Sequence, residues 1–104
     1  MNDPIPPTRE FVLNALHDVI DPEIGYNIVD IGLIYGVTVH GNRVDVRMTM
    51  TTPGCPAQDY IQSGVQERSL QIPGVDTVAV ELVWEPRWSV EKMTPAAKAH
   101  VGIA

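Results

Sequence analysis

The segment 33–50, LIYGVTVHGNRVDVRMTM, constrains the fold more than any other part of the chain. Apolar and polar residues alternate on both sides of Gly41-Asn42, and a two-residue connection with glycine first is typical of a β-hairpin. Pairing His40 with Arg43 places the apolar residues of both strands on one face. The sequence therefore predicts an antiparallel hairpin whose apolar face needs a covering layer. The valines on that face are Val37, Val39, Val44 and Val46.

A helix is predicted ahead of the hairpin. Thr8 suits the N-cap position, where a side-chain oxygen accepts from a free amide. Apolar residues at positions 12, 15, 16 and 19 follow the spacing of a helix that is buried on one face. We expect this helix to end at Asp21-Pro22, because the residue before proline avoids helical backbone. The segment 23–35 fits neither period, so we expect a packed loop that leads into the first strand.

A second helix is predicted after the hairpin, followed by a third strand. Pro56 fits the first position of a helix, which makes Cys55 its N-cap or nearly so. Apolar residues at 57, 61, 65 and 72 lie on one stripe, and Pro73-Gly74 closes the helix. The segment 75–84 alternates as a strand, and Ser89 and Thr94-Pro95 are expected to start short helices.

This order of elements indicates an α+β fold. Helix, strand, strand, helix and strand, followed by short C-terminal helices, predict a two-layer sandwich with a three-stranded sheet covered on one side. A chain of 104 residues is the size of one domain. We therefore expect residues 1–104 to form a single domain.

Charge and hydropathy exclude several classes of partner. The formal net charge is −6, and the seven basic residues are scattered. Nucleic-acid binding needs clustered Lys and Arg, so we expect no nucleic-acid partner. No apolar run approaches the roughly 20 residues that span a bilayer, and the first residues lack the profile of a signal peptide. We expect a cytoplasmic protein with no membrane partner, in a reducing compartment.

The one cysteine, Cys55, lies in TMTTPGCPAQDY. A single thiol excludes an internal disulfide and a self-contained four-cysteine zinc or iron–sulfur site. A cysteine at a helix start lies beside free amides, which lower a thiol pKa from near 8.5 to roughly 3.5–7.5. Such a thiolate attacks electrophiles and binds metal, whereas a lone cysteine is more commonly a small buried apolar residue. Cys55 is a candidate ligand to iron or to a cluster, and the packing alternative stays open.

Two threonines precede this cysteine. Thr51 and Thr52 lie at the end of the second predicted strand, where ligand sites gather in layered folds. Their hydroxyls are candidates to hold a bound group or a cysteine-bound metal. The alternative is that they bond to the backbone of the turn.

Three acids are further candidates. Asp21 is expected either to end a helix or to be a polar residue of the site around Cys55. Glu23 is expected either to be solvated or to belong to that site. Asp30 has apolar neighbours on both sides, and a buried carboxylate needs hydrogen-bond partners. Those partners are either the amides of the following turn at 31–33 or groups near Cys55. Nothing in the sequence brings a histidine to Cys55, so a Cys-His nucleophilic pair has little support.

Three blocks of the sequence together resemble a known family. DPEIGYNIVDIGLIYGV, MTMTTPGCP and IPGVDTVAVELVWEPRW occur in the order found in small iron–sulfur cluster assembly factors, over residues 11–103. This family includes the bacterial Suf-system auxiliary factor, the phenylacetate-degradation D subunit and the cytosolic iron–sulfur targeting factor. The resemblance implies that the cysteine of the T-x-x-x-C-P motif is Cys55 and its threonine Thr51. It places the family's D-P-E block at 21–23 and its buried acid at Asp30.

The resemblance also implies a fold related to iron–sulfur scaffold and carrier domains. It implies an auxiliary role in cluster assembly or transfer rather than an enzyme, with assembly scaffolds, carriers and client proteins as partners. The ending WSVEKMTPAAKAHVGI most resembles the short bacterial, Suf-associated type. The cysteine-rich C-terminal region of the phenylacetate D subunit and a Walker motif are both absent from the sequence.

One cysteine limits how a cluster is handled, because clusters are commonly held by four thiolates. We expect no tightly bound cofactor in one chain, but transient contact with iron or a cluster. Three arrangements stay open: a homodimer, a site shared with a partner's cysteines, or an adaptor that binds no cluster. Rival interpretations are a thiol enzyme using Cys55 with Asp30 or a histidine, an accessory factor for a metabolic oxygenase complex, and an acidic interaction module.

Overall fold

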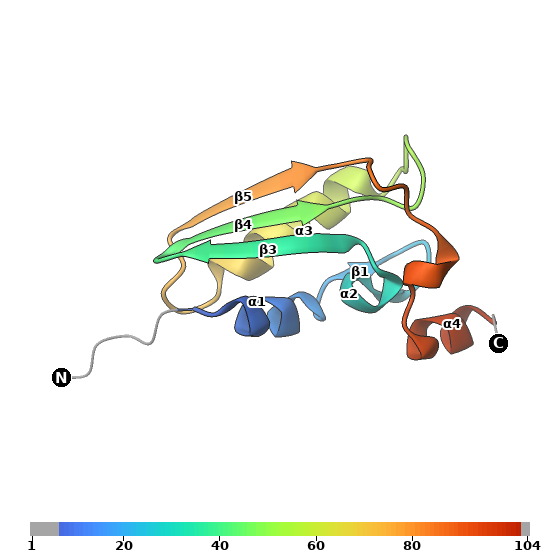
Figure 1. Ribbon diagram of the computed structural model, residues 1–104, viewed down its shortest axis with the longest axis horizontal. Helices are drawn as coiled ribbons and strands as arrows, with labels where there is room; N and C mark the ends of the chain where they lie inside the picture. Colours follow the sequence, from blue (N-terminus) through green and yellow to red (C-terminus); the bar gives the residue numbers. More distant parts are fainter. Residues whose placement is uncertain (1–6, 103–104) are drawn as a thin grey trace.

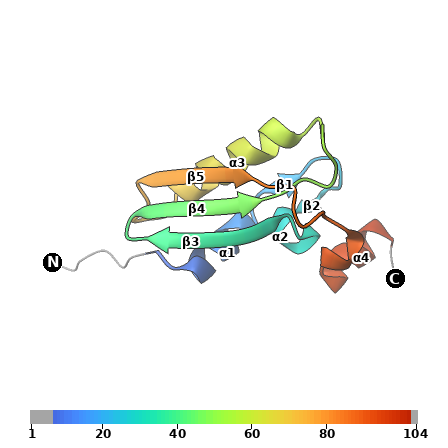
Figure 2. The ribbon, with the colours of Figure 1, turned by 45° about the horizontal axis from the view of Figure 1, so that its top comes forward.

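The structure, a computed structural model, describes residues 7–102. Helices α1 and α3 cover one face of a three-stranded sheet of order β3-β4-β5, and within residues 7–102 no helix covers the other face (Figures 1 and 2). The predicted α+β two-layer fold is confirmed. The elements are α1 Arg9–Leu16, β1 Ile20–Asp21, β2 Tyr26–Asn27, α2 Ile28–Ile31, β3 Ile34–His40, β4 Arg43–Met48, α3 Gln58–Leu70, β5 Thr77–Leu82, the 3-10 helix η1 Val90–Lys92, and α4 Pro95–Val101.

The hairpin has the predicted register. His40 pairs with Arg43 and Val39 with Val44 in antiparallel strands. Strand β5 then pairs with β4 in parallel along its whole length. A parallel pair needs a crossover connection, and α3 is that crossover. β5 is shorter at both ends than the predicted strand at 75–84.

The core lies between the covered face of the sheet and the two helices. The predicted helical stripes are buried, and so are the alternate residues of the central strand β4. Burial of this apolar surface is the main term that stabilises the fold. The buried residues that carry the two stripes and the sheet face are Val12, Ala15, Leu16, Val19, Ala57, Ile61, Val65, Ile72, Val37, Val44, Val46 and Met48.

The first helix is shorter than predicted. Thr8 is its N-cap and accepts from the Phe11 amide at 3.1 Å, as expected. The helix ends at Leu16, however, and not at Asp21-Pro22. The ring Nδ1 of His17 lies 3.0 Å from the carbonyl of Leu13, so a side chain takes up a carbonyl that a further helical turn would use. The chain then turns so that 20–21 pair with 26–27.

The segment 23–35 contains a short helix where we predicted a loop. The Asn27 side chain caps α2 by accepting from the Asp30 amide at 2.8 Å, and Gly32 ends it with φ of +90°. Four residues are too few to show a helical period in sequence. A Cβ at Gly32 would lie 2.5 Å from the carbonyl oxygen of Lys92. Glycine therefore permits both the left-handed turn and the close approach of the C-terminal segment.

The C-terminal segment is fastened to α2. Ser89 and Thr94 start the two predicted short helices, η1 and α4. The Thr94 amide donates to the Asp30 carbonyl at 2.8 Å, and the Trp88 indole Nε1 donates to the Ile31 carbonyl at 2.9 Å. Of the helices within residues 7–102, none is long and apolar enough to cross a membrane.

Candidate functional site

The loop between β4 and α3, residues 49–57, carries the motif around the cysteine. It leaves the sheet at the end where β4 finishes and β3 begins (Figure 1). The Thr49 amide donates to the Leu33 carbonyl at 2.8 Å, which anchors the start of the loop. Residues 52–54 are exposed at its tip, whereas Cys55 behind them is buried.

The prediction that Cys55 is an exposed thiolate at a helix start is wrong for this structure. Helix α3 begins at Gln58, and its N-cap residue is Ala57 and not Cys55. The Gln58 amide donates to the backbone carbonyl of Cys55 at 3.0 Å, so Cys55 opens a turn that precedes the helix. The cysteine is only 7% exposed and belongs to the hydrophobic core. Pro56 therefore marks a turn here, and the side chain on its N-terminal side packs inward.

The two threonines differ in their surroundings. Thr52 is exposed at the tip of the loop, while Thr51 is half-buried. Thr51 lines a hollow of about 270 Å³ together with Trp84 and Trp88, which follow β5. The loop that carries Cys55 and the segment after β5 therefore line the same hollow.

The acid Asp21 has a structural role in a turn. It is 2% exposed, and its Oδ1 accepts from the Glu23 amide at 2.9 Å. Its backbone carbonyl accepts from the Gly25 amide at 2.7 Å. Glu23 itself is exposed. The D-P-E block therefore forms the turn between β1 and β2.

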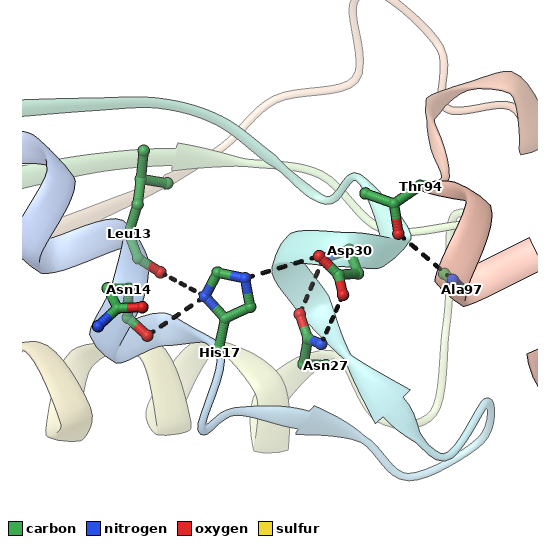
Figure 3. Close-up of polar contacts among 7 residues, drawn as sticks. All are labelled: Leu13, Asn14, His17, Asn27, Asp30, Thr94 and Ala97. Atoms are coloured by element: carbon green, nitrogen blue, oxygen red, sulfur yellow. Dashed lines mark hydrogen bonds and ion pairs between the residues drawn. The ribbon is translucent and has the colours of Figure 1, made fainter.

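Asp30 joins two helices. Figure 3 shows its carboxylate between the ring of His17, the C-cap of α1, and the side-chain amide of Asn27, the N-cap of α2. Oδ1 lies 3.6 Å from His17 Nε2, and Oδ2 accepts from Asn27 Nδ2 at 3.2 Å. The predicted partners in the following turn are wrong, because the Gly32 amide donates to Val29 and the Leu33 amide to Ile28.

The contact between His17 and Asp30 had no signal in the sequence. Thirteen positions separate the two residues, and His17 is the C-cap that follows the last residue of α1. The spacing of Asn27 and Asp30 was a usable signal, because a capping residue followed three positions later by an acid is typical of a helix start. The Asp30 carboxylate thus lies at the junction of α1 and α2, in contact with the cap residue of each.

The structure does not gather the candidate residues into one metal site. Within residues 7–102, no three His, Cys, Asp or Glu side chains lie together as a set that could hold a metal ion. Asp21 and Asp30 serve the turns around α2, and Cys55 lies in a different loop.

Comparison with known proteins shows the family. The family model described as iron-sulfur cluster assembly protein matches residues 9–82, so the chain belongs to this family. An Fe-S protein maturation auxiliary factor from Porphyromonas gingivalis is 39% identical over 103 residues, which cover 98% of each chain. The Fe-S protein maturation auxiliary factor SufT from Staphylococcus aureus is 39% identical over 87 residues, 83% of this chain and 99% of that protein.

A solved structure from Bacillus anthracis, described as a domain of unknown function DUF59, has the same fold. Its TM-score is 0.87 at 41% identity, and the match covers 92% of both chains. The resemblance seen in the three sequence blocks is confirmed, and so is the relation of the fold to iron–sulfur assembly proteins. The matched region at 9–82 contains all the predicted site residues. Their individual roles stay predictions.

Proposed function

We propose that this protein is an auxiliary factor in the maturation of iron–sulfur proteins, and that iron or a cluster is its transient cargo. The observation that supports this most directly is the family match at 9–82. The end-to-end likeness to the P. gingivalis maturation factor adds to it, because the two chains share nearly their whole length. Its partners are then an assembly scaffold or carrier and the client proteins that receive the cluster.

Cys55 contributes one sulfur ligand during transfer. Clusters are commonly held by four thiolates, and this chain has one cysteine. The remaining ligands come from the partner that donates or receives the cluster. A shared site of this kind forms only while the two proteins are in contact, which suits a factor that passes its cargo on.

The burial of Cys55 requires the loop to move before the sulfur binds iron. Residues 52–54 are exposed and lie outside the regular strands and helices. Moving this loop costs less than opening a strand or helix, although the core contacts of Cys55 itself are lost. At rest the thiol is covered, and this limits its oxidation, which depends on exposure. Partner binding is the event that uncovers it.

The role is accessory rather than catalytic. The relatives reported above are named maturation auxiliary factors. A thiol enzyme needs an accessible nucleophile with a general base in reach. At rest Cys55 is 7% exposed within the core, so its sulfur would reach a small substrate only after the same loop opening that the transfer role requires.

The proposal is tested in cells that lack the protein. The activities of several iron–sulfur enzymes should fall while the amounts of their polypeptides stay constant, and enzymes without clusters should be unaffected. Supplying the wild-type chain should restore the activities. Unchanged iron–sulfur enzyme activities in the deletion strain, under iron limitation as well as in rich medium, would contradict the proposal.

A further inference from the structure

A groove between α2, strands β3 and β4 and the segment after β5 has cations as its charged lining residues, although the whole protein is acidic. It has a volume of about 560 Å³, and its charged lining residues are two cations, Arg47 and Lys92, with no carboxylate among them. The chain as a whole has a net charge of −6. The apolar and aromatic residues of the lining include Val29, Ile34, Tyr35 and Pro86.

The walls of this groove are held together by contacts between distant parts of the chain. The Tyr35 hydroxyl donates to the Pro86 carbonyl at 2.7 Å, which ties β3 to the segment after β5. The backbone of Lys92 packs closely against Gly32, as described above. The groove is therefore preformed, and a ligand would not have to order it on binding.

Neither cation is committed to a strong internal partner. Arg47 Nε lies 3.7 Å from Glu81 Oε1, and both side chains are more than half exposed, so this ion pair contributes little. Lys92 Nζ lies 5.1 Å from the centroid of the Tyr35 ring. This cation–π contact is weak, because Lys92 is exposed. Both side chains can turn toward a carboxylate of a ligand, because the interactions that they would give up are weak.

We infer that this groove binds an acidic segment of a partner protein. A carboxylate of the segment contacts Arg47 and Lys92, and a neighbouring apolar side chain packs against Val29, Ile34 and Pro86. Charge complementarity supports this occupant, because the groove lining holds two cations and no carboxylate, on a chain whose net charge is −6. The apolar wall favours a peptide over nucleic acid, which would also meet the repulsion of the net negative charge.

This inference does not depend on the role of Cys55. The groove is lined by residues of α2, β3, β4 and the segment after β5, and the cysteine is not among them. Failure of the groove to bind acidic peptides would leave the proposed maturation role unaffected. A result against the maturation role would likewise leave the groove's ligand preference standing.

The test uses a fluorescein-labelled peptide of alternating glutamate and leucine residues, with binding followed by anisotropy on the intact chain. Arg47→Gln and Lys92→Gln should each weaken binding about tenfold, the loss expected for a charge-assisted hydrogen bond. Raising the salt concentration from about 50 mM to about 300 mM should also weaken peptide binding to the wild-type protein. Arg43→Gln is the matched control, since Arg43 lies on the same strand and pairs with Asp45 at 3.0 Å.

The control should bind within about twofold of wild type, and so should Cys55→Ala, which lies outside the groove. Absence of peptide binding would overturn the inference. So would an equal loss in the Arg43→Gln control, since the peptide would then respond to charge anywhere on the surface. Tighter binding of a single-stranded oligonucleotide of the same charge would overturn the choice of a protein partner.

Discussion

The indole Nε1 of Trp88 donates to the carbonyl of Ile31 at 2.9 Å, across 57 positions of sequence. Ile31 is fully buried, and it ends the α2 helix beside Gly32. This hydrogen bond holds the segment after β5 against α2. This segment lines both the hollow beside Thr51 and the groove that contains Arg47 and Lys92. The hydrogen bond therefore helps to position the walls of both.

Removing the indole donor should destabilise the fold. Trp88→Phe keeps an aromatic ring but leaves a buried carbonyl without its partner, so the free energy of unfolding should fall by about 1–2 kcal/mol. For a domain of this size that corresponds to a loss of roughly 4–16 °C in Tm, measured by circular dichroism. Trp84→Phe, at a residue that is 39% exposed, is the control and should melt like wild type. Equal melting of both variants would show that the bond contributes nothing.

Gly32→Ala should be more damaging than the same change at another left-handed glycine. Gly32 has φ of +90° and leaves 2.5 Å between an added Cβ and the Lys92 carbonyl oxygen, whereas Gly41 has φ of +60° and open space. Gly41→Ala should cost about 1 kcal/mol from backbone strain alone. Gly32→Ala should cost at least about 2 kcal/mol more, because backbone must also shift. Urea unfolding of both variants measures this, and equal losses would contradict the close approach.

The sequence predicted the sheet and the two covering helices well, because their signals are local and repeated. The hairpin register follows from the period of two and from Gly41-Asn42, which together leave one self-consistent pairing. The helical stripe through Ile61 and Val65 likewise fixes which face is buried. Thr8 and Thr94 were recognisable as caps because a cap acts on amides only three positions away.

The sequence predictions were wrong where tertiary contacts determine the local backbone conformation and the direction of a side chain. The α2 helix is shorter than the period that would reveal it, and the contact of His17 with Asp30 depends on how α1 and α2 pack. Proline at 56 suits both a first helical position and a turn before the helix, and only the packing of the loop selects the turn. The inward direction of Cys55 follows from that choice. The burial of Cys55 was therefore not predictable from the sequence, and the roles of the candidate site residues stay predictions.

Tyr35 should ionise at unusually high pH. Burial, and to a smaller extent the charge of Glu85, raise the pKa of Tyr35 above its ordinary value of 10.0. The neutral phenol is favoured in the folded state, so its contribution to stability is complete below pH 10 and is lost as pH rises through the higher folded value. Glu85→Gln should lower the pKa of Tyr35 only part of the way, since burial is the larger cause.

The difference in tyrosinate absorbance between wild type and Tyr35→Phe isolates this titration from the other two tyrosines. A Tyr35 pKa at or below that of a free tyrosine would show that the Tyr35 ring is not desolvated as the structure has it. A full return to the ordinary value in Glu85→Gln would instead reverse the order of the two causes.

The Cys55 thiol should react slowly until its loop opens. With 7% exposure, alkylation by iodoacetamide should be at least about tenfold slower in the native protein than in urea, because it waits for local opening. Pro53→Gly should raise the native rate by favouring open conformations of the loop. Pro73→Gly, beyond the other end of α3, is the control and should not. Native alkylation as fast as in urea would mean that the loop does not cover the sulfur.

The most direct test of the central claim is whether the thiol is needed in cells. Cys55→Ala should lose about 1 kcal/mol for the missing buried atom, and Cys55→Ser a similar amount for a hydroxyl placed among apolar side chains, so both should stay folded with Tm lower by about 4–8 °C. Both should nevertheless fail to restore iron–sulfur enzyme activities in cells lacking the protein, while Thr52→Ala, in the same exposed loop, should restore them. Full restoration by Cys55→Ala at normal protein levels would contradict the account and remove the sulfur from the mechanism.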